Sequence, residues 1–269
     1  MKPLKKSELK EFLDEKVHLY NTPDFIPDDP ISIPHQFHLK EDIEISAFLT
    51  ALIAWGQRKV ILRNANDLMR RMDHEPFEFI LNHSLKERKT FNDFVHRTFN
   101  GIDAIYLLKA LQKMYQSNTS LENIYSEALN DSNDFAKALH EAREKILSFD
   151  APTRTNKHIA DPLRNSSAKR ICMYLRWMVR KDKAGVDFGI WKNIKMKDLH
   201  CPLDIHSGRV ARTLGLLERR QDDWKAVTEL TFNLRKLDKN DPVKYDFALF
   251  GLGVYKELQA ASPKTQDFF

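Results

Sequence analysis

The sequence predicts an all-α protein with two helical lobes. Three observations support this fold class: most segments repeat apolar residues at helical spacing, no segment alternates apolar and polar residues as a series of strands would, and only 8 of the 269 residues are glycine. The chain divides into an N-terminal helix and connector (1–40), a helical lobe (41–150) and a second helical lobe (151–269). We expect the N-terminal segment to pack back on the second lobe.

The first 40 residues combine one helix with a proline-rich connector. An amphipathic helix is expected over Ser7–Tyr20. Prolines at 23, 27, 30 and 34 argue against regular structure from Asn21 to His38, so this stretch is predicted to be extended. His35 and His38 are three residues apart, but a proline-rich loop is a poor metal site, and we expect no bound metal.

The strongest helical segment, from Glu41 to Met72, is interrupted at residues 55–57. Its first half is apolar on nearly every side and predicts a buried central helix, whereas its second half is amphipathic and cationic. The interruption places polar groups where a buried helix meets an exposed one. Such a corner suits a ligand site, and it equally suits an ordinary turn between two helices.

The remaining elements follow from helical periodicity and from proline and polar breaks. Residues 90–99 are open between a helical turn and a short extended stretch, 151–162 form a polar loop between the lobes, and 183–199 form an irregular insert. Further helices are expected over Pro76–Asn82, Asp103–Tyr115, Ser120–Ala128, Asn133–Phe149, Asn165–Lys181, Asp222–Leu234 and Asp241–Leu258.

Lys169 lies in the first turn of the expected helix Asn165–Lys181, which Ser166 or Ser167 can cap. The helix dipole is positive at that end and disfavours an ammonium group there, which lowers the pKa of a lysine. A neutral amine is the form that acts as a nucleophile. The alternative is an ordinary surface lysine.

Asp204 precedes a further helix within Cys201–Leu217, whose apolar positions 205, 210, 214 and 217 are expected along one side. A carboxylate in this position accepts free backbone N–H groups, so Asp204 is predicted to be the N-cap. A catalytic role is the alternative, and it requires support from the rest of the chain.

Positive charge concentrates in the middle of the chain. Between residues 161 and 220 there are 14 Lys and Arg against 6 Asp and Glu, a balance of +8 within a total of +5. This distribution suits a polyanion such as nucleic acid, or else a set of solvated helix faces.

No leader or membrane segment is visible in the sequence, because the N-terminus is charged and no apolar run approaches spanning length. Cys172 and Cys201 are the only cysteines, and two thiols alone hold neither a structural zinc nor an iron–sulfur cluster. We therefore expect a cytoplasmic protein.

The stretch P-L-D-I-H-S-G-R-V-A-R-T-L-G-L resembles P-V-D-T-H-V-x-R-V-x-x-R-L-G-L of the helix-hairpin-helix (Gly/Pro…Asp) DNA glycosylase superfamily. Two further segments agree in order and character: residues 44–61 resemble its early buried helix with a Gln-containing corner, and 241–253 its late helix. The resemblance covers residues 41–258 and is closest to a divergent bacterial branch, similar to archaeal 8-oxoguanine glycosylases. The matching motif residues are Pro202, Asp204, His206, Arg209, Val210, Leu214, Gly215 and Leu216.

The chain departs from the superfamily pattern in two places, and the first of them concerns the lysine. The superfamily's hairpin reads L-P-G-V-G-x-K about eighteen residues before the aspartate, and nothing of that form stands there in this chain. Thr213 also replaces an arginine of the motif. Lys169, 35 residues before Asp204, is the best-placed alternative, with Lys181 and Lys183 in reserve.

The resemblance implies a DNA base-excision repair glycosylase that extrudes a damaged base from duplex DNA. Asp204 would stabilise positive charge on the sugar, and Lys169 would make the enzyme a bifunctional glycosylase and AP lyase, acting on an oxidised purine such as 8-oxoguanine. The partner would be double-stranded DNA with a damaged or mispaired base, the protein a monomer associated with the nucleoid when engaged. No cofactor is implied, although the hairpin region has room for a monovalent cation.

The remaining site residues are assigned by residue type. Gln57 and Arg58 would fill the gap left by the base or read its partner, and His206 is interpreted as a structural hydrogen-bonding residue on the DNA-binding side. Arg209 and Arg212 would hold phosphates. The aromatic candidates for stacking on the base are Trp55, Trp177, Trp191 and Phe188, and a place in the core is the alternative for each of them.

Two alternatives stay open beside the enzyme. The first is a catalytically inactive helical DNA-binding protein that keeps the scaffold, and the second is a helical protein without any role on DNA. Salt-sensitive DNA binding separates the second alternative from the other hypotheses.

Overall fold

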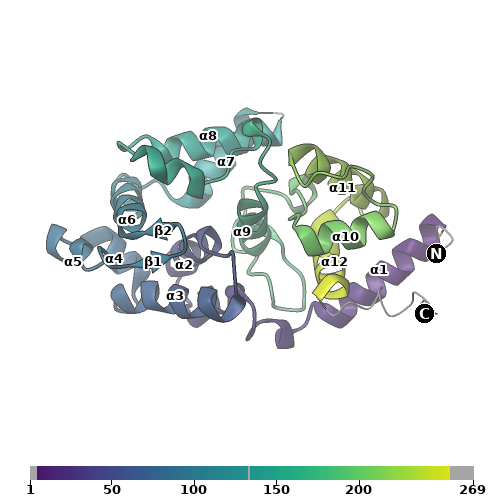
Figure 1. Ribbon diagram of the computed structural model, residues 1–269, viewed down its shortest axis with the longest axis horizontal. Coiled ribbons are helices and arrows are strands. Elements are labelled where there is room, and N and C mark those ends of the chain that lie inside the picture. Colours follow the sequence, from purple (N-terminus) through teal and green to yellow (C-terminus); the bar gives the residue numbers. More distant parts are fainter. Residues whose placement is uncertain (1–4, 133, 255–269) are drawn as a thin grey trace, which may run out of the picture.

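The computed structural model describes residues 5–132 and 134–254 and confirms the all-α fold. Figure 1 shows two groups of helices on either side of α9. α2 to α8 form the first group, and α10, α11 and α12 form the second together with α1. The helices are α1 (Lys6–Tyr20), α2 (Lys40–Leu52), α3 (Arg58–Arg71), α4 (Pro76–Asn82), α5 (Leu85–Lys89), α6 (Gly101–Gln116), α7 (Leu121–Asp131), α8 (Phe135–Leu147), α9 (Lys169–Val179), α10 (Ile205–Thr213), α11 (Trp224–Leu237) and α12 (Tyr245–Val254).

α2 is the buried central helix that the sequence predicts. Every residue from Ile43 to Leu52 is buried, and the helix packs against α4 and α9. The chain then turns at residues 53–57 and resumes as α3, whose buried residues lie on one side. Gly56 adopts a φ of 105°, and a side chain there would meet the Arg97 guanidinium at 2.8 Å. The turn therefore requires glycine.

Residues 90–99, for which the sequence allows a helical turn or a short extended stretch, lead into a hairpin of two short strands. Strand β1 (Val95–His96) pairs antiparallel with β2 (Phe99–Asn100), and Arg97 in the turn has a φ of 56°. The His96 ring also bonds the Trp55 carbonyl oxygen at 3.0 Å, so the hairpin supports the corner between α2 and α3. The expected helix start at Asn133 lies outside the described residues, as does the expected end at Leu258.

α9 begins later than its serines suggest. Neither Ser166 nor Ser167 caps it; the N-cap is Ala168, in the left-handed region at φ 46°, and Ser166 Oγ instead accepts the Ala168 N–H at 3.2 Å. The helix is buried almost along its whole length, because helices of both groups surround it (Figure 1).

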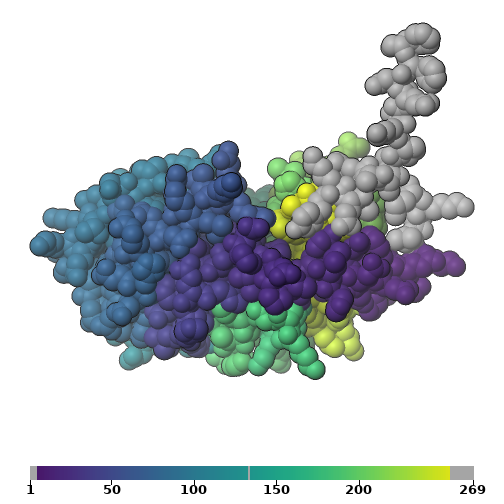
Figure 2. Space-filling model, turned by 90° about the horizontal axis from the view of Figure 1, so that it is seen from below, coloured from purple at the N-terminus to yellow at the C-terminus, as the bar shows by residue number. Residues whose placement is uncertain are grey.

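Residues 21–39 form a strap that joins α1 in the second group to α2 in the first (Figures 1 and 2). The prediction of a fully extended connector is wrong. Pro23, Pro30 and Pro34 each begin a single 3₁₀ turn, because their fixed φ suits a first helical position and their missing N–H is not needed there. The short 3₁₀ helices are η1 (Pro23–Phe25), η2 (Pro30–Ser32), η3 (Pro34–Gln36), η4 (Thr153–His158), η5 (Pro162–Arg164), η6 (Met196–Asp198) and η7 (Pro242–Lys244).

Two side-chain contacts hold the strap against the insert that follows α9. Asn21 Nδ2 donates to Asp182 Oδ2 at 2.5 Å, and the His35 ring bonds the Val186 carbonyl oxygen at 2.8 Å. α1 itself packs on α12, where Gly251 allows the Tyr20 ring to approach the helix. The first and the last described helices thus pack directly on each other. No helix of the described ranges has both the length and the apolar character that crossing a bilayer requires.

Candidate functional site

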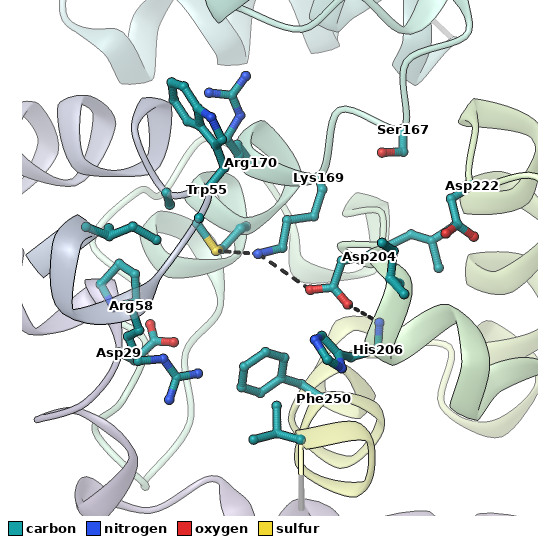
Figure 3. Close-up of a pocket in the computed structure, with 18 residues that line it drawn as sticks. Asp29, Trp55, Arg58, Ser167, Lys169, Arg170, Asp204, His206, Asp222 and Phe250 are labelled. Carbon is teal, nitrogen blue, oxygen red and sulfur yellow. Dashed lines mark hydrogen bonds and ion pairs between the residues drawn. The ribbon is translucent and has the colours of Figure 1, made fainter. Parts of the chain in front are cut away.

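A pocket of about 630 Å³ opens where the two helical groups meet (Figure 3). The corner before α3 supplies one wall, the beginning of α9 a second and the beginning of α10 a third. Asp29 and Pro30 of the strap also line it, as do Phe250 and Val254 of α12. Its size is that of a site for a small organic ligand or a nucleoside.

Asp204 is the N-cap of α10, as predicted. Its Oδ1 accepts the main-chain N–H groups of His206 at 2.9 Å and Ser207 at 3.0 Å, and Ser207 Oγ accepts the Asp204 N–H at 3.0 Å. This reciprocal arrangement fixes the carboxylate, since two of these hydrogen bonds and the helix dipole act on it. Its other oxygen, Oδ2, is directed toward Lys169 (Figure 3).

Lys169 is the first residue of α9. Its Nζ lies 3.8 Å from Asp204 Oδ2 and 3.5 Å from Met173 Sδ, and both ion-pair side chains are about a quarter exposed. The structure therefore brings together two predicted residues that are 35 positions apart in the sequence. Lys181 and Lys183 lie beyond the end of α9, are exposed and do not line the pocket.

The corner before α3 supplies an aromatic wall. The Trp55 ring lines the pocket, with the Arg170 guanidinium 4.7 Å from the ring centroid and the His96 ring edge-on at 4.9 Å. Burial lowers the pKa of Arg170 to about 10. Arg58 also lines the pocket, whereas Gln57 is exposed just before α3 and is not part of the wall.

The other aromatic candidates do not line the pocket. Trp177 is 0% exposed and Trp191 is 2% exposed, so neither face is open to a ligand. Trp191 packs edge-on against Tyr174 at 5.4 Å, and Phe188 stacks on His35 at 4.3 Å. Trp177 and Trp191 thus take the core position that the sequence also allows for them.

The arginines of α10 do not face the pocket as free cations. Arg209 donates to the Gly253 carbonyl oxygen at 3.1 Å, which ties α10 to α12. Arg212 pairs with Asp222 at 2.6 Å and donates to the Arg219 carbonyl oxygen at 2.8 Å. Both hold their own scaffold, and neither lines the pocket, so the predicted phosphate contacts gain no support here.

Two residues at the start of α10 differ from their predicted places. His206 lines the pocket with an exposed ring, and its hydrogen bond to Asp204 comes from its main-chain N–H. Ile205 was expected on the buried side of the helix but is 77% exposed and also lines the pocket. The cap explains this, because the first turn points to the cleft and only later positions such as Val210 reach the core.

Two of the cations in the basic middle of the chain, residues 161–220, are buried and are less accessible to a polyanion than the charge count suggests. Arg176 is 4% exposed and bonds Asp187 and Asp246, while Arg180 is 2% exposed and pairs with Asp182, Asp187 and Asp241. Both cations are neutralised inside the protein. These two arginines are therefore not available to an external polyanion, because carboxylates of the insert after α9, of Asp241 and of α12 pair with them.

Two carboxylates beside the Lys169–Asp204 pair were not predicted. Asp29 lines the same pocket from the strap, and Asp246 of α12 lies beneath Lys169 and Asp204 in a small adjoining cavity. Burial raises the pKa of Asp29, and it raises that of Asp246 to about 6 against the opposing charge of Arg176. A lone aspartate within the apolar run YDFALFGLG was a usable signal for Asp246. Asp29 gave none.

Across residues 5–132 and 134–254, no three His, Cys, Asp or Glu side chains gather closely enough to hold a metal ion. The chain matches no curated protein and no solved structure. A family model described as "Protein of unknown function (DUF2400)" matches residues 29–255, which is most of the chain. The match begins at the strap residue that lines the pocket and ends at the close of α12, so it includes every wall of the site. The chain belongs to the DUF2400 family.

Proposed function

We propose that this protein is a DNA N-glycosylase with AP-lyase activity, which uses Lys169 as its amine nucleophile and Asp204 as its catalytic carboxylate. The observation that carries the proposal is the 3.8 Å approach of Lys169 Nζ to Asp204 Oδ2 in an open pocket. The aspartate belongs to the only segment that resembles a glycosylase motif in detail, and the lysine reaches it from a separate helix. Lys169 and Asp204 stand at the beginnings of two different helices, so their approach is not a consequence of being close in the sequence.

In the proposed reaction the Lys169 amine attacks C1′ of an extruded nucleotide and the C1′–N bond breaks, with the base leaving with the bonding electron pair. Asp204 stabilises the positive charge that develops on the sugar and accepts the proton that the amine loses, which then passes to the departing base. Opening of the sugar ring gives a Schiff base. Loss of a C2′ proton then eliminates the 3′ phosphate and cleaves the strand.

The pocket has features that an extruded base requires. It is large enough for a nucleoside, and the Trp55 ring, backed by Arg170, offers a flat surface for stacking. Base–aromatic stacking contributes about 1–3 kcal/mol per base in nucleic-acid complexes. Arg58 and Arg170 supply positive charge at a site that must accept a nucleotide.

The turn before Lys169 also supports the resemblance. The superfamily's hairpin L-P-G-V-G-x-K ends in its lysine, and its first glycine stands four residues earlier. In this chain that position is Asn165, which adopts a left-handed φ of 61°, and a short 3₁₀ helix from Pro162 to Arg164 leads into it. Asparagine tolerates this conformation better than most residues. We infer that residues 162–168 take the place of the hairpin, with Asn165 in the position of its first glycine.

The experiment is incubation with duplex oligonucleotides that carry 8-oxoguanine, uracil or an abasic site, followed by borohydride trapping. We expect a covalent protein–DNA adduct that disappears in Lys169→Ala and persists in Lys181→Ala, a matched lysine outside the pocket. Asp204→Asn should slow strand cleavage by about 10²-fold or more, because it removes the charge but keeps the cap acceptor.

If the protein binds DNA in a salt-sensitive way but processes none of these lesions, and Asp204→Asn changes nothing, the non-catalytic DNA-binding alternative replaces the enzyme. Absence of DNA binding would rule out both the glycosylase and the non-catalytic DNA-binding protein.

A further inference from the structure

Asp29 is held in the pocket wall by the strap. Its side chain is the N-cap of η2, where Oδ1 accepts the Ile31 N–H at 3.1 Å, and the residue is 8% exposed. Figure 3 shows it beside Arg58 on the α3 side of the pocket, with Asp204 and His206 on the α10 side. A carboxylate thus lies across the pocket from the proposed catalytic pair.

The other carboxylates of this region already have cationic partners. Asp204 has Lys169, Asp222 has Arg212, and Asp246 has Arg176. No Lys or Arg of the described residues lies within ion-pair distance of Asp29, although Arg176, Lys169 and Arg58 act on it from farther away. Burial raises its pKa, since the Ile31 N–H is its main local compensation. A buried acceptor in this state is stabilised by any ligand that brings N–H donors to it.

We propose that Asp29 is a specificity-determining residue that hydrogen-bonds the extruded base and selects bases with two adjacent N–H donors on one edge. This inference rests on the proposed function. A carboxylate offers only acceptors. A guanine-type edge, with a ring N–H next to an exocyclic amine, presents two donors to it. Uracil has a single ring N–H between two carbonyl groups, whose oxygens would face the carboxylate, and a hypoxanthine-type base lacks the amine.

The position of Asp29 makes the selection effective. A site built to hydrogen-bond its substrate rejects an analogue without the donor far more strongly than an apolar pocket rejects a missing methyl group. Asp29 is nearly dry and is fixed by its own cap, so it cannot turn to solvent when the wrong base enters. The chain therefore carries a selection element outside the helices that hold the proposed chemistry.

The test compares base release from duplexes carrying 8-oxoguanine, 8-oxohypoxanthine (which lacks the exocyclic amine) and uracil, with strand cleavage at a preformed abasic site measured in parallel. We expect the wild-type chain to prefer 8-oxoguanine over 8-oxohypoxanthine by about 10-fold or more. Asp29→Asn keeps the cap acceptor but replaces the second oxygen with a donor. The preference should fall to near 1 in this variant, while abasic-site cleavage stays within about twofold.

Asp28→Asn, an exposed neighbour in the same strap, is the matched control and should leave both readouts unchanged. A preference that survives Asp29→Asn, or equal wild-type release of uracil, overturns the role of Asp29. Should Asp29→Asn fold poorly, abasic-site cleavage falls too, and Asp29→Glu then decides: a retained preference supports the carboxylate, and a lost one with intact cleavage refutes it. Failure of wild-type abasic-site cleavage and trapping would instead refute the proposed function itself.

Discussion

At the scale of single residues, burial changes the protonation of Asp246. Its pKa is raised to about 6 from an ordinary value of 3.8, although Arg176 opposes this shift. Between about pH 4 and 6 the folded protein therefore holds this proton more often than the unfolded chain does. The contribution of this carboxyl to stability is complete below about pH 4 and is lost as the pH rises through 6, by at most about 3 kcal/mol.

We expect Asp246→Asn, which cannot titrate, to lose less stability than the wild type between pH 4.5 and 7. Urea unfolding at four pH values across this range measures the free energy of unfolding, and Asp24→Asn, an exposed strap residue, serves as the control. An identical pH slope in Asp246→Asn and the wild type would contradict the raised pKa.

Some residues of the site follow from local sequence rules, whereas others depend on how distant parts of the chain come together. The cap role of Asp204 follows from local rules, because helix N-termini select a short acceptor side chain. Lys169 was singled out by its expected place in the first turn of a helix, but only the resemblance gave a reason to pair it with Asp204. Asp29 was missed because its place in the pocket depends on how the strap crosses the molecule, and nothing within a few residues of it records that path.

At the scale of elements, the contact between α1 and α12 depends on Gly251. A Cβ built there would lie 2.3 to 2.5 Å from carbons of the Tyr20 ring, closer than real side chains approach. We expect Gly251→Ala to destabilise the protein by about 1–3 kcal/mol, since the rigid ring must move out of a packed interface. Thermal or urea unfolding measures the change.

A double-mutant cycle with Tyr20→Ala identifies the cause of this loss. Removing the ring also removes the clash, so the double variant should be more stable than the sum of the two single effects predicts, by about 1 kcal/mol or more. Additive effects would show that Gly251 matters for another reason.

Element boundaries were predicted well where sequence and local geometry agree. α4 begins and ends at the predicted residues, because Pro76 fixes its start and a polar turn its end. α9 was predicted too early, because Ser166 and Ser167 are good caps in isolation. The chain instead uses Ala168 in a conformation that costs an alanine about 1–2 kcal/mol, and only the surrounding packing offsets that cost.

At the scale of the whole molecule, Arg180 joins parts that are distant in the sequence. From α9 it pairs with Asp182 at 2.7 Å, Asp187 at 3.0 Å and Asp241 at 2.9 Å. Asp182 also binds the strap through Asn21, and Asp241 begins the turn that leads into α12. One guanidinium thus connects α9, the insert, the strap and the second group of helices.

We expect Arg180→Met to lose about 3–5 kcal/mol of stability, because it leaves buried carboxylates without a counter-charge. Arg70→Met is the matched control, since Arg70 pairs with Asp67 on the surface and should contribute less than about 1 kcal/mol. Calorimetry and tryptophan fluorescence should report a single shared transition in both variants. A loss no larger than that of Arg70→Met would contradict the role assigned to this network.

The packing of the first helix against the last described one has a consequence for synthesis on the ribosome. α1 is made before the strap and the pocket helices, but its partner α12 is completed only near residue 254, so the contact between them must wait until the intervening chain has been made. Until then Asp29 has no finished pocket to enter, because Phe250 and Val254 of α12 line it as well. Closing so long a loop is also slow in folding terms. A nascent chain that has not yet reached α12 therefore lacks a complete pocket.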